Sequence, residues 1–143
     1  DTIGLDEHMA RHRHADLFLD TFIYNAHTTA ADALWMGLPL VTLPGRAFAS
    51  RVAASLLEAV ALPELVAKDA ADYERIALEI ATQPGKLAAI KQKLARNRLS
   101  EPLFDTIRFT RNFENAYEAI FQRLIDGLPP ADIDVADHGP TFA

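Results

Sequence analysis

Apolar and polar positions repeat with two different periods along the chain, and these periods predict short strands alternating with helices. Two compact apolar runs rich in strand-forming residues, 16–23 and 38–45, predict buried strands, and 64–68 predicts a short third strand. Apolar residues at helical spacing predict helices, which are expected over 5–15, 29–37, 47–62, 70–82, 86–100 and 106–127. Strand followed by helix, repeated, favours an α/β fold with a Rossmann-like parallel sheet and flanking helices.

Breaks in these periods give the expected boundaries. Gly37 before Leu38-Pro39 ends one helix, and Asp69-Ala-Ala-Asp72 resembles a capping box at the start of another. Trp35 and the aromatic stripe over 109–121 are predicted to be core. We expect one domain over 1–128. The proline- and aspartate-rich residues 129–143 are expected to be a disordered tail.

Composition narrows the classes of function. The formal net charge of −6 argues against a general nucleic-acid or anionic-membrane surface. There are no cysteines, which excludes thiolate metal sites and cysteine nucleophiles and fits a reducing, cytoplasmic compartment. No apolar run reaches the roughly 18 residues of a membrane span, and the N-terminus does not resemble a signal peptide. The sequence begins without methionine, so we expect a piece truncated at its N-terminus.

The segment "YNAHTTAAD" (24–32) carries more polar groups than a helix start requires. The first interpretation is structural: Thr29-Ala-Ala-Asp32 matches a capping box, in which Thr29 caps the helix and Asp32 reaches back. That interpretation leaves His27 and Thr28 unexplained.

The second interpretation is a ligand site at the same helix start. Unpaired N–H groups and the positive end of the helix dipole favour an anion there, and hydroxyls from Thr28 and Thr29 and a nitrogen of His27 add donors suited to a diphosphate. Asp32, one turn further on, can accept hydrogen bonds from two vicinal ribose hydroxyls. The chain has no glycine-rich fingerprint, P-loop or G-x-S-x-G elbow, which disfavours dehydrogenase, kinase-type and serine-hydrolase sites.

His8 and Arg11 pose a similar choice. Both belong to a mixed-charge helix face that water alone can solvate. Alternatively, because they are three residues apart, they can offer a flat ring and a planar donor to a nucleobase. His8 and His12 have i, i+4 spacing, but no third ligand is evident, so we expect no metal site.

The stretches "GLPLVTLPG" (37–45) and "ASRVAAS" (49–55), together with the H-x-x-R and HTT-x-x-D patterns, resemble the family 41 glycosyltransferases, which include the O-linked N-acetylglucosamine transferases. The likeness extends over roughly residues 6–124. It implies the C-terminal, nucleotide-sugar-binding half of a GT-B fold. It also implies that His27, Thr28 and Thr29 contact the donor's diphosphate, that Asp32 binds the ribose, and that His8 and Arg11 contact the nucleobase.

The resemblance further implies an inverting, metal-independent transfer of N-acetylglucosamine from UDP-GlcNAc to Ser or Thr of an acceptor protein. The UDP-sugar is then a substrate, and no cofactor is expected. No residue here is expected to be catalytic, because the family's phosphate-binding lysine and proposed proton acceptors lie upstream. The implied partners within the same parent protein are the N-terminal GT-B half and helical TPR repeats. Alone, the 143 residues are expected to be inactive.

Three positions depart from the family pattern. Leu5 stands where many relatives have a nucleoside-binding lysine, and Ala26 and Ala30 replace the glycines that commonly flank HTT. Two alternatives therefore stay open: another donor, such as GDP-fucose or UDP-glucose, and a non-catalytic remnant that has kept the fold.

Overall fold

The structure, a computed structural model, describes residues 3–137 and 139. The chain divides into two compact units, Asp1–Arg98 and Leu99–Ala143, of which the first contains every predicted site residue. Its helices are α1 (Leu5–Ala10), α2 (Thr28–Trp35), α3 (Val52–Ala59), α4 (Ala70–Thr82) and α5 (Pro84–Asn97). Short 3-10 helices are η1 (Arg11–His14), η2 (Phe48–Ser50) and η3 (Pro63–Leu65), and the strands are β1 (Phe18–Leu19) and β2 (Leu40–Val41). In the part of the chain that the structure describes, every helix is too short or too polar to span a bilayer.

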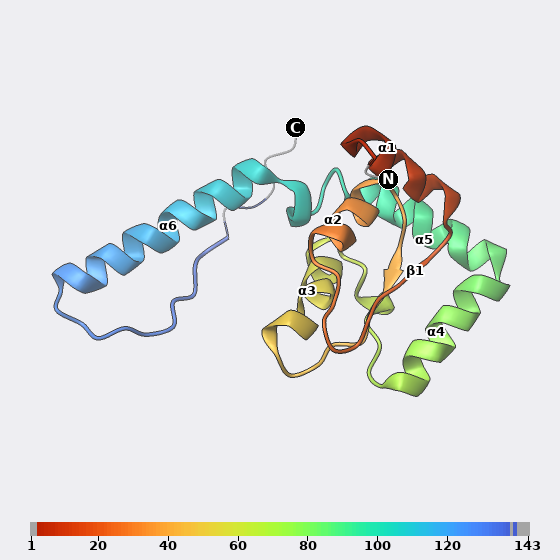
Figure 1. Cartoon of the computed structure of the whole chain (residues 1–143). Coiled ribbons are helices and arrows are strands. Elements are labelled where there is room, and N and C mark those ends of the chain that lie inside the picture. Colours follow the sequence, from red (N-terminus) through yellow and green to blue (C-terminus); the bar gives the residue numbers. More distant parts are fainter. Residues whose placement is uncertain (1–2, 138, 140–143) are drawn as a thin grey trace. The chain divides into compact units, whose positions relative to one another are not determined.

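The sheet is parallel, as predicted, but smaller than the apolar runs suggest. Phe18 pairs with Leu40 and Leu19 with Val41, and a single parallel bridge joins Thr42 to Val66. The predicted third strand at 64–68 is therefore reduced to that bridge, because η3 occupies Pro63–Leu65. In Figure 1, α2 and α3 lie on one side of β1 and α4 on the other. The α/β order of strand and helix is thus as expected.

The core of this unit lies around β2, which contacts both α2 and α4. The fully buried side chains come from six elements and include Ala33, Leu34, Leu40, Val41, Leu57, Leu65, Ile80 and Leu94. The predicted burial of 38–45 thus holds for β2. The predicted burial of 16–23 is wrong: Leu19 is 55% exposed and Ile23 90% exposed. Among the described residues β1 pairs only with β2, so it is an edge strand with one unpaired edge.

Local signals set most helix ends. Gly37 has φ +82°, and the Leu38 N–H donates to Ala33 O at 2.8 Å, which closes α2 as the sequence predicts. The predicted helix over 5–15 changes at Arg11 from α1 to η1, and the one over 47–62 is divided into η2 and α3. These two helices are shorter than their apolar patterns suggest, since periodicity does not report such changes in helix type.

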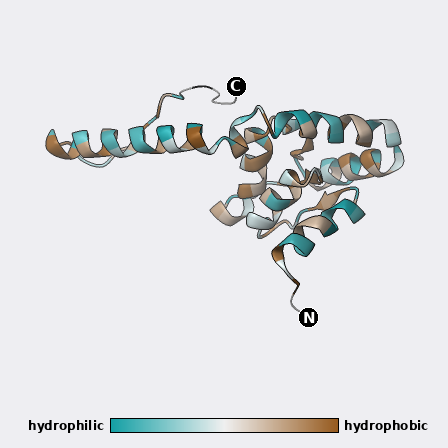
Figure 2. Ribbon diagram, turned by 90° about the horizontal axis from the view of Figure 1, so that it is seen from above, coloured by the Kyte–Doolittle hydropathy of each residue, from teal (hydrophilic) through white to brown (hydrophobic). Residues whose placement is uncertain are grey.

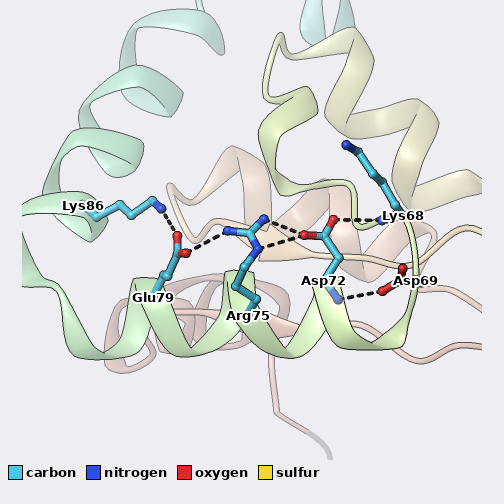
Figure 3. A network of polar contacts seen from close by, with 6 residues as sticks. All are labelled: Lys68, Asp69, Asp72, Arg75, Glu79 and Lys86. Atoms are coloured by element: carbon cyan, nitrogen blue, oxygen red, sulfur yellow. Dashed lines mark hydrogen bonds and ion pairs between the residues drawn. The ribbon is translucent and has the colours of Figure 1, made fainter.

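Helix α4 matches its prediction from Ala70 to Thr82, and its start has the expected aspartate cap. Asp69 accepts a hydrogen bond from the Asp72 N–H at 2.8 Å, while the Asp72 carboxylate accepts from the Lys68 N–H at 3.0 Å. Figure 3 shows the network continuing along the helix through Arg75, which bonds Asp72 and Glu79. The Arg75 guanidinium, followed by the Lys68 N–H, lowers the pKa of Asp72. Exposed pairs of this kind contribute little to stability.

The second unit consists mainly of α6 (Thr106–Ile125), preceded by η4 (Pro102–Phe104). Asp105 caps α6 by accepting from the Arg108 N–H at 3.0 Å. Residues 129–137 form no helix or strand, but Arg108 and Asn112 both bond the Asp137 carboxylate, and Arg123 bonds Pro129 O at 2.6 Å. Figure 2 shows hydrophobic and hydrophilic residues interleaved along this helix.

The prediction that Trp35 and the aromatic stripe are core is wrong. Trp35 is 45% exposed, and the Arg98 guanidinium lies 5.8 Å from its ring centroid. The stripe is at least half exposed at Phe109, Phe113, Tyr117 and Phe121. Within its own unit, among described residues, α6 meets only short segments, so no described element covers the whole apolar face. Helical spacing reports that a face is apolar, not that something covers it.

Candidate functional site

A pocket of about 430 Å³ lies at the carboxyl end of β1, where the chain turns into α2. Such an edge is the usual ligand site of a parallel α/β sheet. Three of the predicted residues, His27, Thr28 and Thr29, line it. The full lining consists of Phe18, Asp20, Thr21, Tyr24, Asn25, Ala26, His27, Thr28 and Thr29.

The predicted capping box at 29–32 is wrong. Helix α2 begins at Thr28, so its N-cap is His27, and no side chain forms a cap hydrogen bond there. The helix starts one residue earlier than the S/T-x-x-D pattern requires, because the His27 carbonyl already accepts from the N–H groups of Ala30 and Ala31, each at 3.1 Å. The structural interpretation of Thr29 and Asp32 therefore loses its support.

The start of α2 offers donors to a ligand. No described residue accepts a hydrogen bond from the N–H of Thr28 or Thr29, and both residues are exposed. The hydroxyls of the same two threonines add two more donors. Together with the helix dipole, this arrangement suits an anion with several oxygens.

The His27 ring is held beside these donors. It stacks on Tyr24, with centroids 4.8 Å apart and planes 18° apart, and meets Phe48 edge to face at 6.0 Å. Its Nε2 lies 3.2 Å from the carbonyl oxygen of Ala49. That oxygen also accepts from the Asn25 N–H at 2.8 Å. The loop before α3 therefore holds the turn before α2.

Asp20 shapes this turn and was not predicted as a site residue. It is 4% exposed, and its Oδ1 accepts from the N–H groups of Thr21 at 2.9 Å and Ala26 at 2.7 Å. Its Oδ2 accepts from the Thr42 hydroxyl at 2.6 Å. Tyr73 of α4 donates its hydroxyl to the Asp20 carbonyl oxygen at 2.9 Å, and burial raises the pKa of Tyr73. Both carboxylate oxygens of Asp20 accept hydrogen bonds from the protein itself, so we regard Asp20 as a positioning residue.

Gly45 allows the second loop to fold tightly. A Cβ at Gly45 would lie 2.4 Å from Ser50 Oγ and 2.9 Å from Ser50 Cβ, and the Gly45 N–H donates to Ser50 O at 2.8 Å. This close approach brings Phe48 and Ala49 round to His27. The sequence signal for it is the Pro44-Gly45 pair, which marks a turn but not its role.

The remaining predicted residues lie near α1. His8 Nε2 is 3.9 Å from Asp32 Oδ2, and both side chains are partly exposed. His8 also meets His12 edge to face at 5.4 Å. Arg11 lies in η1, and no described residue forms a hydrogen bond or ion pair with its side chain. The structure thus brings His8 and Asp32 together and leaves Arg11 exposed to solvent.

Comparisons with a protein-family model and with known proteins identify the family of this chain. Residues 2–113 match the model of glycosyl transferase family 41, more than half of the chain. The chain belongs to this family. It is 40% identical over 124 residues to a UDP-N-acetylglucosamine–peptide N-acetylglucosaminyltransferase of Caenorhabditis elegans, covering 87% of this chain and 11% of the relative. It is 37% identical over 137 residues to the probable enzyme of that name, SEC, of Arabidopsis thaliana, covering 95% of this chain and 14% of the relative.

A solved structure gives the same result at the level of fold. The chain matches a Thermobaculum terrenum O-GlcNAc transferase carrying a K341M substitution, with a TM-score of 0.79 and 32% identity, over 87% of this chain and 24% of that one. The predicted fold class, the Rossmann-like C-terminal half of a GT-B glycosyltransferase, is confirmed. The chain spans only 11–14% of the length of the two curated relatives.

Proposed function

We propose that this chain is the donor-binding part of a protein O-glycosyltransferase that transfers N-acetylglucosamine from UDP-GlcNAc to Ser or Thr of proteins. The names of the two relatives, which specify UDP-N-acetylglucosamine and a peptide, support this donor and acceptor. The observation that carries the proposal is the start of α2. Two exposed N–H groups without acceptors among the described residues, two hydroxyls and an imidazole converge there on one pocket.

Each predicted residue then has a task. Thr28, Thr29 and His27 bind the diphosphate, and Asp32 binds the ribose hydroxyls. In the inverting reaction, an acceptor hydroxyl attacks the anomeric carbon while the bond to the diphosphate breaks. Donors fixed at a helix start stabilise the negative charge that develops on the leaving group. They need no metal ion for this task, and we propose metal-independent transfer without a cofactor.

His8 and Arg11 are proposed to contact the nucleobase. Arg11 is exposed and unpaired among the described residues, so its planar donor group is available to a base. His8 lies beside Asp32, which places a flat ring next to the proposed ribose position. We assign no catalytic residue to these 143 positions.

The transfer reaction is proposed for the whole protein rather than for this segment. Its further parts are proposed to be the N-terminal GT-B half and TPR repeats, and its location the cytoplasm, in line with the absence of cysteine.

A donor with another base or sugar is a second candidate. It is favoured by Leu5, which is 72% exposed and cannot supply the charge of the lysine expected there.

Calorimetric titration of the full-length protein with UDP-GlcNAc, UDP-glucose and GDP-fucose tests the proposal. We expect the tightest binding for UDP-GlcNAc. His27→Ala should weaken it by about 1.5–3 kcal/mol, the contribution of a charge-assisted hydrogen bond. His14→Ala is the matched control, since His14 is exposed and outside the pocket. Tighter binding of GDP-fucose would identify it as the donor in place of UDP-GlcNAc. Binding of none of the three would indicate a non-catalytic remnant that has kept the fold.

A further inference from the structure

The ring of His27 has one nitrogen engaged by the protein and one left for a ligand. Nε2 lies 3.2 Å from Ala49 O, and a carbonyl oxygen can only accept a hydrogen bond. Nε2 must therefore carry a proton. No described residue forms a hydrogen bond with Nδ1, so Nδ1 is the nitrogen that remains for a ligand.

The contacts around the ring oppose a flip that would exchange each ring nitrogen with a ring carbon. Ala49 O is itself fixed by the Asn25 N–H at 2.8 Å. Tyr24 covers one face of the imidazole, and the Phe48 ring stands perpendicular to it, at 82°. A flip would leave Ala49 O with a C–H group in place of its second donor.

This arrangement determines how the ring can treat an anion. With Nε2–H fixed, a neutral imidazole has a lone pair on Nδ1, which repels a phosphate oxygen. A charged imidazolium has a proton on Nδ1 and donates to it. We propose that His27 binds the donor's diphosphate as an imidazolium through Nδ1, and that Tyr24 and Ala49 O position it for this. The inference rests on the proposed function and adds to it a protonation state and a positioning residue, Tyr24.

Charged and titratable groups near His27 come from three segments. Asp20 lines the same pocket, and its carboxylate favours a positive ring. Tyr24 is the other titratable group of the lining besides His27 itself. Arg46 and Arg51 flank the loop that carries Phe48 and Ala49, and their charges oppose the imidazolium. The diphosphate, with two negative charges, is the largest favourable partner.

Proton uptake on binding measures the proposed state directly. The full-length protein is titrated with UDP-GlcNAc near pH 7.5 in Hepes and in Tris, buffers with different ionisation enthalpies and no phosphate group to compete for the site. UDP-GlcNAc is preferred to UDP because its doubly esterified diphosphate does not titrate near neutral pH. We expect uptake of about half a proton or more per donor bound, and Kd should rise with pH towards a limit of about tenfold per pH unit.

Two variants separate protonation from positioning. His27→Gln retains a donor that does not titrate, so its binding should take up no proton and should not vary with pH. Tyr24→Ala removes the stacked ring and should reduce both the affinity for the donor and the proton uptake. The conservative Tyr24→Phe keeps a ring and should retain both.

The outcomes distinguish this inference from the function on which it rests. Binding of UDP-GlcNAc by the wild type without proton uptake would overturn the imidazolium and leave the proposed function in place. If proton uptake is undiminished in His27→Gln, the proton binds to another group, and the proposed imidazolium form of His27 is overturned as well. Failure of the wild type to bind UDP-GlcNAc would overturn the proposed function and this inference together.

Discussion

His8 Nε2 lies 3.9 Å from Asp32 Oδ2, so α1 and α2 meet through the two side chains assigned to the nucleoside end of the site. Both side chains are partly exposed, at 26% and 28%. An exposed pair at this distance contributes little to stability, so either residue can turn to a ligand at low cost. Neither side chain has a structural task that its replacement would abolish.

Replacing Asp32 tests the ribose assignment. Because no side chain caps α2, Asp32→Ala should leave the melting temperature nearly unchanged. It should weaken binding of UDP by about 1–3 kcal/mol, through the loss of hydrogen bonds to a charged acceptor. A UDP analogue lacking both ribose hydroxyls should bind wild type and variant equally. Equal losses for UDP and the analogue would contradict the assignment.

Thr42 and Asp20 give a prediction about stability. Thr42 is fully buried and donates to Asp20 Oδ2 at 2.6 Å. Thr42→Val keeps the shape but removes the donor from a buried carboxylate, which should lower the free energy of unfolding by about 1–3 kcal/mol. Thr42→Ser keeps the hydroxyl and should lose less. Chemical denaturation of the three proteins measures the difference, and a stability loss in Thr42→Val no greater than in Thr42→Ser would count against the hydrogen bond.

Gly45 gives a prediction that links packing to binding. A methyl group at Gly45 would overlap Ser50, so Gly45→Ala should displace the loop that carries Phe48 and Ala49. Weaker binding of UDP-GlcNAc is expected, together with a loss of stability of about 1–3 kcal/mol. Gly85→Ala is the control, since nothing lies within 4 Å of its added Cβ and alanine favours the α5 helix. Similar effects of both substitutions would contradict the packing argument.

The contact of residue 137 with α6 predicts a dependence on pH. The Arg108 guanidinium, then the Asn112 amide, holds the pKa of Asp137 well below its ordinary range. The carboxylate therefore favours the bound segment above about pH 4, the ordinary aspartate range, and this contribution is lost as the pH falls towards the lowered native pKa. The NMR order parameters of the 129–137 backbone should fall on acidification. In Asp137→Asn these order parameters should be low at every pH, and a wild-type profile in that variant would contradict the prediction.

The fold was predictable where the signal is local. Helix α4 begins and ends as predicted, because Asp69 caps it within the same short segment that carries the sequence pattern. Burial was less predictable. The apolar run ending at Ile23 has the composition of a core strand, yet its exposure depends on which elements cover it. The aromatic stripe of α6 was misjudged for the same reason.

The candidate site was predicted in part. His27, Thr28 and Thr29 lie together because they are adjacent in sequence, and their pattern was visible. Asp20 and Ala49 were not identified, since each acts on a partner 22 residues away. Such a partner becomes apparent only once the strands are paired. Whether the predicted residues bind a nucleotide sugar stays a prediction.

The carbonyl of Ala49 couples two successive strand-to-helix connections, the one before α2 and the one before α3. It receives both Asn25 N–H and His27 Nε2, so the connection before α2 cannot shift without the connection before α3. A ligand that orders one should order the other. The buried Asn25 amide is therefore an intrinsic reporter: the rate at which its hydrogen exchanges with solvent should slow when the donor binds, although the amide itself is turned towards the protein.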